Sequence, residues 1–457
     1  MTTKIKIVGA GLAGCEAAWQ CARRGHEVEL YEMRPVKSTP AHETDKFAEL
    51  VCSNSLKSES ENTAPWLLKE EMRRVGSLLL RIAHETSVPA GHALAVDRDT
   101  FAAKVTDAIS AEPNIKVIRQ EFTQITEDDG LTVIATGPLT SDALSSEIGR
   151  LSGSNHLFFY DSISPIVEAD SIDMSKVYMA ARYNKGTADY INCPFTKDEY
   201  DRFYDALVAA ESVESHDWEK LNYFEGCLPI EEIGRRGRDT LRYGPMKPVG
   251  LDDPRTGRWP YAVVQLRQEN LRADSYNLVG FQNHLKYGDQ ARVLRLIPGL
   301  ENAKFLRYGQ IHRNTYINAP TLLTEILNLK QHANVFFAGQ ISGVEGYTES
   351  IAMGMLAGIN VTRIAQGLPA VPPPRETALG SLVHYICHAE VKHFQPANIT
   401  FDLLPQLSEA ERRKIRDKKL RHKIVCENAL ERLASWNQEI GAGLHAPASL
   451  YESSIRS

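Results

Sequence analysis

Long apolar runs are missing from this sequence of 457 residues, although 43% of the residues are hydrophobic. Stretches without a charged side chain, such as Thr377–Ala389, are all too short for a membrane span, which needs roughly 18 residues. The N-terminus lacks the basic and apolar segments that form a signal peptide. We therefore expect a cytoplasmic protein that makes no use of a membrane.

Paired cysteines are missing as well. The seven cysteines are an odd number and include no CxxC pair, so we expect free thiols in a reducing compartment rather than a disulfide framework. A spacing that suits a metal, with residues i and i+4 on one helix face, occurs at His384, Cys387, His388 and His393. No companion pair of ligands occurs elsewhere in the sequence, and we predict no metal site.

An excess of basic residues is missing too. The 52 Lys and Arg against 58 Asp and Glu give a net charge of −6, which provides no general attraction to nucleic acid. Residues 411–423 (ERRKIRDKKLRHK) are the exception, with eight basic residues against two acids. This segment either binds phosphates or forms the solvated face of a helix, and the sequence leaves both interpretations open.

A glycine-rich turn between an apolar strand and a helix is present near the N-terminus. Its GxGxxG pattern runs from Gly9 to Gly14, and a second strand pattern ends at Glu32. Gly9 allows a tight turn, Gly11 lets the backbone approach a pyrophosphate, and Gly14 lets the helix pack closely on the strand. The pyrophosphate would lie at the helix N-terminus, and the Glu32 carboxylate would bind the ribose hydroxyls. The segment predicts dinucleotide binding.

Two later segments favour FAD over NAD as this dinucleotide. A strand pattern runs into Ala135, Thr136 and Gly137, a turn typical of two-dinucleotide-type flavoproteins. A second glycine-rich junction between strand and helix follows at residues 334–347, where a helix N-terminus would approach the flavin end of the cofactor. A second complete GxGxxG is missing, so we expect no separate nicotinamide domain.

The cofactor segments lie at both ends of the chain, which predicts that the middle is an insertion. We expect an α/β fold in which residues 1–175 and 331–457 form a Rossmann-type FAD-binding domain of the two-dinucleotide type. Residues 176–330 would form an inserted α/β substrate domain, and 331–457 would end in a basic helical region. The length suits about three compact segments.

Several longer segments resemble the TrmFO family and span about residues 4–405. They are LYEMRP (30–35), ELVCSNSLKS (49–58), ALAVDR (93–98), VIATGPLT (133–140), FEGCLPIE (224–231), GPMKPVGL (244–251), VQLRQEN (264–270), IPGLENAKF (297–305) and FFAGQISGVEGYTES (336–350). Members of that family are folate- and FAD-dependent tRNA (uracil-C5)-methyltransferases that act at T-loop position 54. The resemblance implies methylenetetrahydrofolate as carbon donor, a flavin reduced by NADH or NADPH, and tRNA as the partner.

The resemblance also implies that Cys52 and Cys227 are catalytic. Carbon C5 of uracil is a poor nucleophile until a thiolate adds to C6, and a base must then remove the C5 proton. We interpret Cys227 as the nucleophile and Cys52 as its partner, and leave their order open. Candidate sources of positive charge for the thiols are Lys57, Arg235 and Arg236. The other cysteines are expected to be packing residues.

The residues expected to hold FAD come from the glycine motif, the strand ends and the segment beside Cys52. They are Gly9, Ala10, Gly11, Leu12, Ala13, Gly14, Glu32, Met33, Arg34, Ser53, Asn54, Ala135, Thr136, Gly137, Gly339, Gln340, Gly346, Tyr347 and Ser350. Tyr347 either stacks on the flavin or the pterin, or is a core tyrosine. Further candidates, for a ligand or the uracil edge and for RNA phosphates, are His312, Arg313 and Asn314, and Arg235, Arg236 and Arg238.

Other functions stay open from the residues alone. The same chemistry on ribosomal RNA fits equally well. A flavin oxidoreductase acting on a small molecule would explain the FAD segments, but it would leave Cys52, Cys227 and the basic segment without a role. A flavoprotein that modifies the wobble uridine, or a binding protein without activity, would leave the segments around the two cysteines unexplained.

Overall fold

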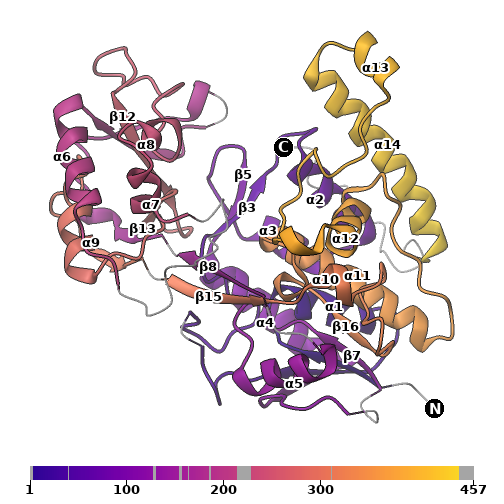
Figure 1. Ribbon diagram of the computed structural model, residues 1–457. Helices are drawn as coiled ribbons and strands as arrows, with labels where there is room; N and C mark the ends of the chain where they lie inside the picture. Colours follow the sequence, from indigo (N-terminus) through magenta and orange to yellow (C-terminus); the bar gives the residue numbers. More distant parts are fainter. Residues whose placement is uncertain are drawn as a thin grey trace.

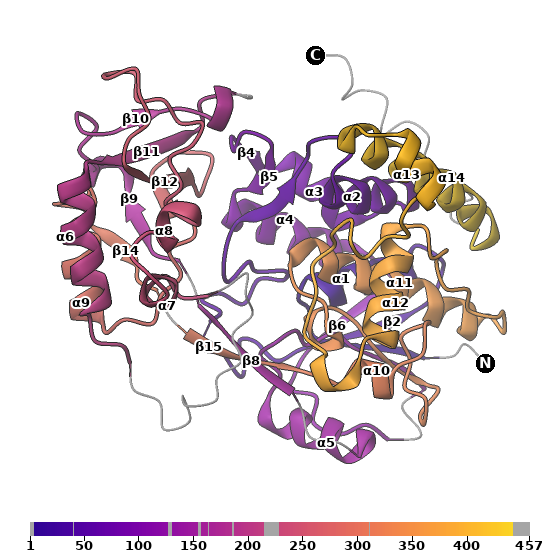
Figure 2. The ribbon, with the colours of Figure 1, turned by 45° about the horizontal axis from the view of Figure 1, so that its top comes forward.

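The computed structural model describes residues 4–39, 41–126, 130–153, 157–162, 164–184, 187–213, 228–309 and 311–441, with the backbone alone for 157–162 and 311–313. Figures 1 and 2 show two bodies side by side. A ribbon of two antiparallel strands, β8 (Leu157–Ser162) and β15 (Ile311–Tyr316), carries the chain from the larger body to the smaller one and back. Within these ranges, no helix is both long enough and apolar enough to cross a membrane.

The larger body is built on a parallel five-stranded sheet with the order β16-β7-β1-β2-β6. The strands are β1 (Ile5–Val8), β2 (Val28–Glu32), β6 (Ile115–Arg119), β7 (Leu131–Ile134) and β16 (Val335–Phe337). The order reverses at β1, because the chain adds β2 and β6 on one side and then β7 and β16 on the other. This is the Rossmann arrangement, which places a ligand at the carboxyl ends of the strands near the reversal.

Helix α1 (Leu12–Ala22) packs against α11 (Tyr347–Ala365), so the two ends of the chain share one core. Two glycines of α11 make this contact close. A Cβ atom on Gly354 would lie 2.2 Å from the carbonyl oxygen of Ala13, and one on Gly358 would lie 2.7 Å from that of Ala17. Larger side chains at these positions would force the two helices apart.

The other helices of the larger body surround this pair. They are α2 (Ala64–Val75), α3 (Leu78–Glu85), α4 (Arg98–Ala111), α5 (Asp142–Ser152), α10 (Ala319–Leu322), α12 (Ala378–His388), α13 (Glu409–Lys414) and α14 (Lys418–Glu439). The long helix α14 buries the stripe Cys426, Ala429, Leu433 and Trp436. A small antiparallel sheet with the order β3-β5-β4 comprises Ser55–Ser58, Ala93–Val96 and Ser87–Val88.

The smaller body is an antiparallel six-stranded sheet with the order β10-β11-β12-β13-β9-β14. Its strands are β9 (Ile166–Glu168), β10 (Tyr178–Met179), β11 (Tyr190–Phe195), β12 (Ala262–Gln268), β13 (Ser275–Leu278) and β14 (Phe305–Arg307). Its helices are α6 (Lys197–Val208), α7 (Ile230–Arg235), α8 (Thr240–Tyr243) and α9 (Tyr287–Leu294). The predicted α/β class, the Rossmann-type sheet and the inserted body are confirmed.

The buried side chains form two main clusters. The chain passes from one cluster to the other before each of the predicted domain boundaries. The smaller body's cluster begins at Val167 and ends at Ala303, and that of the larger body resumes at Tyr316. The division that we predict after residues 175 and 330 therefore falls inside these clusters. The sequence did not show this, because the β8–β15 ribbon and the flanking strands carry no turn-rich linker.

The cysteines that we expect to be packing residues are buried free thiols. Cys15 and Cys21 lie on α1, and Cys193 lies on β11, each without exposed area. Burial raises the pKa of all three thiols, that of Cys21 to about 11. These positions favour packing over reactivity.

Candidate active site

A cavity of about 1020 Å³, its open mouth included, lies at the carboxyl ends of β1 and β7. This is where the strand order reverses, the usual place for a ligand in a sheet of this kind. The glycine turn, the start of α1 and the start of α11 all contribute to its lining.

The three glycines of the turn each show a different constraint. Gly9 has a φ of +99°, and a Cβ there would lie 2.7 Å from the carbonyl oxygen of Ala135. A Cβ on Gly14 would lie 1.7 Å from the carbonyl oxygen of Gly9. A Cβ on Gly11, in contrast, meets nothing within 4 Å and would enter the cavity. Helix α1 follows Gly11, which has no side chain to cap it, so among the described residues its first N–H groups are available to an anion.

Glu32 lies at the end of β2 with its carboxylate fully engaged by the protein. Oε2 accepts from the backbone N–H of Ala10 at 3.0 Å, and Oε1 accepts from the backbone and the guanidinium of Arg34, both at 3.0 Å. Burial acts to raise the pKa of Glu32, but the hydrogen bonds from Arg34 and Ala10 outweigh it and lower the pKa. Ribose hydroxyls at this carboxylate would have to share or replace the Arg34 contacts, because few acceptor positions remain.

Most residues predicted to hold a cofactor line the cavity, and five are not part of its lining. The lining set is Gly9, Gly11, Leu12, Ala13, Glu32, Met33, Arg34, Ala135, Thr136, Gly137, Gly339, Gln340, Tyr347 and Ser350. The five outside the lining are Ala10, Gly14, Ser53, Asn54 and Gly346. Sequence reasoning missed other lining residues, among them Thr39, His42, Glu49, Val51, Gln120 and Phe122. Of these, only Glu49 and Val51 belong to a recognisable segment.

The second glycine junction closes the cavity from the C-terminal end of the chain. Gly339 has a φ of +77°, and a Cβ on it would lie 2.7 Å from the Cβ of Ala13 on α1. Helix α11 begins at Tyr347 without a side-chain cap. Its N-terminus therefore joins that of α1 in lining one cavity, as the paired motifs predict.

Tyr347 connects the cavity wall to the loop that carries Cys52. Its hydroxyl oxygen accepts hydrogen bonds from the backbone N–H groups of Cys52 at 2.8 Å and Ser53 at 3.1 Å. Burial raises the pKa of Tyr347, and Cys52 adds to this effect. The tyrosine is therefore both a wall of the cavity and a support of the cysteine loop.

Arg98 holds the same loop from the other side. Its guanidinium donates to the carbonyl oxygens of Leu50 and Cys52, each at 2.8 Å, and pairs with Glu269 of the inserted body at 2.5 Å. Burial acts to lower the pKa of Arg98, but Glu269, Tyr347 and Cys52 outweigh it and raise the pKa. Sequence reasoning gave Arg98 no role, although it ends the ALAVDR segment.

Ser53 and Asn54 face the inserted body. The Asn54 side chain donates to the carbonyl oxygens of Val96 at 3.0 Å and Gln268 at 2.9 Å, and accepts from Arg267 at 3.0 Å. Arg267 also donates to the Ser53 hydroxyl at 3.3 Å. The loop that holds Cys52 is thus fixed by contacts with β12, and these two residues contact the protein where we predict contact with a cofactor.

The cations near Cys52 differ from the expected ones. Lys57 pairs with the buried Glu349 at 2.6 Å and also donates to Asn398. Arg307 on β14 lies near Cys52. Burial and Arg98 lower the pKa of Arg307, and Cys52 is among the groups that act to raise it. Among the residues that the structure describes, Arg307 makes no ion pair.

Several further candidates are placed only in part. Cys227 lies outside the described residues, and so do the side chains of His312 and Arg313 on β15. Asn314 is buried. In the inserted body, Arg235 pairs with Glu232, and Arg238 with Asp201 and Asp205. Acids therefore neutralise much of the basic GRRGR segment.

FAD fits what the cavity offers, because Gly11 leaves backbone exposed to it and two uncapped helix N-termini line it. The fold and the cavity together define a Rossmann-type flavoprotein fold with an inserted domain.

Comparison with known proteins agrees with this class. The glucose inhibited division protein A family matches residues 4–369. A relative from Koribacter versatilis, named methylenetetrahydrofolate–tRNA-(uracil-5-)-methyltransferase TrmFO, is 79% identical and covers 95% of this chain and 98% of its own. A relative of the same name from Solibacter usitatus is 64% identical, with 96% of this chain and 100% of its own covered. The chain therefore belongs to the glucose inhibited division protein A family and, within it, to the TrmFO proteins.

Solved structures add the fold. GidA from Aquifex aeolicus superposes with a TM-score of 0.71 over 97% of this chain and 76% of its own, at 17% identity. A second crystal form gives a TM-score of 0.70. At this identity the likeness concerns the fold alone, and it confirms the predicted class.

Proposed function

We propose that this protein methylates C5 of a tRNA uracil, with methylenetetrahydrofolate as the carbon donor, FAD as the cofactor and NADH or NADPH as the reductant. The target is the T-loop uracil at position 54. The observation that carries the proposal is the similarity to relatives that bear the name of this activity. One of them is 79% identical over 95% of this chain. The Cys52 loop beside the cavity supports it, because the reaction needs a thiol near the flavin.

A bound FAD would supply the hydride that completes the methyl group. The protein's own part is to place the thiols and the uracil. In our proposal, the Cys227 thiolate adds to C6 of uracil, and C5 then attacks the one-carbon unit. A base removes the C5 proton as the carrier amine leaves the one-carbon unit, and arrival of the hydride on that carbon expels the thiolate and restores the C5–C6 double bond. Cys52 assists as the base or as a transient carrier. Arg98 and Tyr347 position Cys52 through its backbone carbonyl and N–H.

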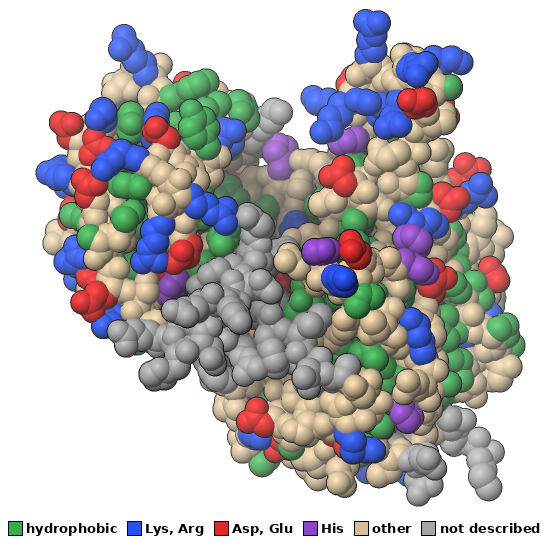
Figure 3. All heavy atoms as spheres, viewed as in Figure 1, with side chains coloured by type: hydrophobic (Ala, Val, Ile, Leu, Met, Phe, Trp, Pro, Cys, Tyr) green, Lys and Arg blue, Asp and Glu red, His purple; other side chains and the backbone are tan. Residues whose placement is uncertain are grey.

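The basic segment 411–423 supports an RNA partner. It forms α13 and the start of α14, where Figure 3 shows Lys and Arg side chains gathered beside a hollow that separates this part from the inserted body. In the described part of the chain, Arg412, Lys414, Lys418 and Lys419 make no ion pair, so their charges are available to phosphates. A uracil in a folded loop must also leave its stack before a thiol can reach C6.

The direct test combines purified holoprotein, NADH, methylenetetrahydrofolate and an unmodified tRNA transcript, with 5-methyluridine measured by mass spectrometry of nuclease digests. We expect folate-dependent product at the T-loop uridine alone. A transcript with that uridine replaced by cytidine is the matched control. Product on ribosomal RNA but not on tRNA would change the target, and rapid NADH oxidation that depends on a small substrate but not on RNA would favour an oxidoreductase.

The cysteine roles need a separate test. Cys227→Ala should abolish methylation while the purified protein keeps bound FAD, and Cys52→Ala should do the same. Cys426→Ala, which changes a buried thiol of α14, is the matched control and should keep most of the activity. Retained methylation in Cys227→Ala would exclude that residue as the nucleophile.

The RNA surface can be tested without touching the cavity. Replacing Lys418 and Lys419 with Gln should weaken tRNA binding. It should also reduce the slope of log K against log salt concentration by about one for each lysine removed. The rate at saturating tRNA should stay unchanged. An unaltered salt dependence would show that the segment is a solvated helix face.

A further inference from the structure

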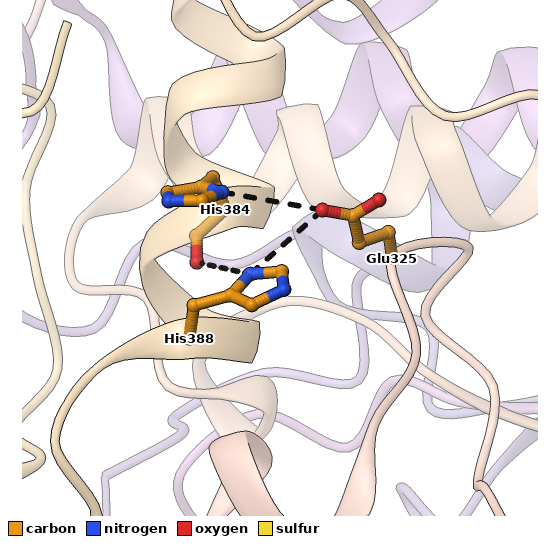
Figure 4. A group of neighbouring side chains, drawn as sticks. All are labelled: Glu325, His384 and His388. Atoms are coloured by element: carbon orange, nitrogen blue, oxygen red, sulfur yellow. Dashed lines mark hydrogen bonds and ion pairs between the residues drawn. The ribbon is translucent and has the colours of Figure 1, made fainter.

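Three side chains with metal-binding groups converge on the outer side of the larger body, away from the cavity lining. Figure 4 shows His384 and His388 one turn apart on α12, with Glu325 facing both from the loop before β16. The Glu325 carboxylate lies 4.0 Å from Nδ1 of His384 and 3.7 Å from Nδ1 of His388. One ligand atom of each residue lies within 4.8 Å of the other two.

The loop and the helix that carry these residues are tied together. The Cys387 thiol donates to the carbonyl oxygen of Thr324 at 3.3 Å, which fixes the residue before Glu325 against the helix. The side chain of Asn360 on α11 donates to the carbonyl oxygen of Ile326 at 3.1 Å, on the other side of Glu325. The carboxylate is therefore held opposite the two imidazoles by the surrounding backbone.

We propose that Glu325, His384 and His388 form a binding site for a divalent transition metal of the zinc class. Two imidazoles and one carboxylate are a ligand set that zinc uses, with water in the fourth position. Ligand atoms around a tetrahedral zinc, at bonds of about 2.0–2.1 Å, lie about 3.3 Å apart. The Glu325 distances of 3.7 and 4.0 Å therefore have to shrink by less than about 1 Å, and the widest separation, which lies within 4.8 Å, by at most about 1.5 Å.

The neighbouring contacts are compatible with metal binding. The two imidazole rings stack with their centroids 4.5 Å apart, so both rings lie on the same face of α12. Nδ1 of His388 also lies 3.1 Å from the carbonyl oxygen of His384. Coordination through this atom would exchange that hydrogen bond for the metal, whereas coordination through Nε2 would keep it.

The sequence spacing alone gave no companion ligand for the two histidines, and the structure provides one in Glu325. A bound metal would join the loop to α12. The carbonyl of Leu327 in this loop accepts from the N–H of Phe337 on β16, the strand that leads into Gly339 of the cavity wall. A metal bound at this surface site would therefore restrain that strand. The site does not depend on the proposed methylation.

The test is a titration of tag-free holoprotein with Zn²⁺ in competition with a chromophoric chelator, and with Co²⁺ followed by absorption. Wild type should bind one equivalent and show the intense visible bands of tetrahedral Co²⁺. His388→Gln should weaken Zn²⁺ binding at least about tenfold, as should Glu325→Gln, which keeps both imidazoles if the histidine variant folds poorly. His393→Gln is the matched control, because His393 is exposed on the following turn and, within the described part of the chain, pairs with Glu390 alone.

Equal Zn²⁺ affinity in wild type, His388→Gln and Glu325→Gln would overturn the proposal. So would a loss in His393→Gln as large as in His388→Gln, because binding would then be a general property of surface histidines. Unfolding temperature with and without Zn²⁺ gives a readout independent of catalysis. It should rise in wild type and in His393→Gln, and stay constant in the other two variants.

Discussion

The glycine turn at residues 9–14 and the cysteine loop at 50–54 flank the same cavity but are built in opposite ways. The turn is held by its own backbone: two of its glycines are required because a Cβ would meet a carbonyl oxygen at 2.7 or 1.7 Å. The loop is held by side chains from three distant elements, which are Arg98 at the start of α4, Tyr347 at the start of α11 and Arg267 on β12.

Under the proposed function, this difference separates the turn that binds the cofactor from the loop that positions a reacting thiol. A cofactor pyrophosphate needs bare backbone and a helix N-terminus, and neighbouring residues can supply both. A reactive thiol needs a set position between two bodies, and only long-range contacts can supply that. We therefore expect changes in the turn to affect folding and FAD binding, and changes around the loop to affect catalysis with FAD still bound.

The largest expected effect concerns the turn itself. Gly14→Val should destabilise the protein by more than about 3 kcal/mol, because its Cβ would lie 1.7 Å from the carbonyl oxygen of Gly9. Gly11→Val should leave the unfolding midpoint of the apoprotein within about 0.5 kcal/mol of wild type and still abolish FAD binding, because its side chain only fills the cavity. Denaturant unfolding and flavin absorbance measure the two effects. Equal destabilisation by both would break the distinction.

The next effect concerns Arg98. Arg98→Gln should cost about 3 kcal/mol in unfolding free energy, because it leaves the buried Glu269 carboxylate without its cation. Methylation should fall further than stability explains, since the Leu50 and Cys52 carbonyls lose their donor. Arg98→Lys should recover part of the stability and little of the rate. A parallel recovery of both would mean that Arg98 acts on stability alone.

A smaller effect is expected at Tyr347. Tyr347→Phe keeps the ring in the cavity wall and removes the oxygen that accepts from the Cys52 and Ser53 N–H groups. FAD should stay bound, and the rate of a single methylation turnover should fall about tenfold, the equivalent of about 1.4 kcal/mol of lost positioning. Rapid-quench measurement on the holoprotein separates this from binding. An unchanged rate would show that the loop does not need this support.

The same contrast decides how much the sequence could predict. The Rossmann sheet, the glycine turn and the junction at Gly339 were predictable, because each follows from residues that are neighbours in the chain. The roles of Arg98 and Arg267 were not, since no pattern reveals that a loop near residue 52 will meet strands some two hundred residues later. Ser53 and Asn54 were predicted at the cofactor for the same reason: their segment was recognised, but the direction of their side chains was not.

Glu32 gives the smallest and most specific prediction, because it belongs to the turn yet depends on a side chain. Its folded-state pKa is lowered from the ordinary 4.5: burial opposes ionisation, but Arg34 and the Ala10 N–H stabilise the carboxylate more strongly. The charged form therefore stabilises the fold above about pH 4.5, and this contribution is lost as pH falls through the lower folded value.

Glu32→Gln removes that titration while keeping the size of the side chain. We expect the apoprotein variant to be less stable than wild type by about 1 kcal/mol at pH 7, because a neutral amide accepts more weakly from Arg34. The difference should stay constant down to about pH 5 and shrink on further acidification. Urea midpoints at pH 7, 5 and 3.5 measure it. A difference that grew on acidification would mean that burial dominates at Glu32, and the turn would then depend on its backbone alone.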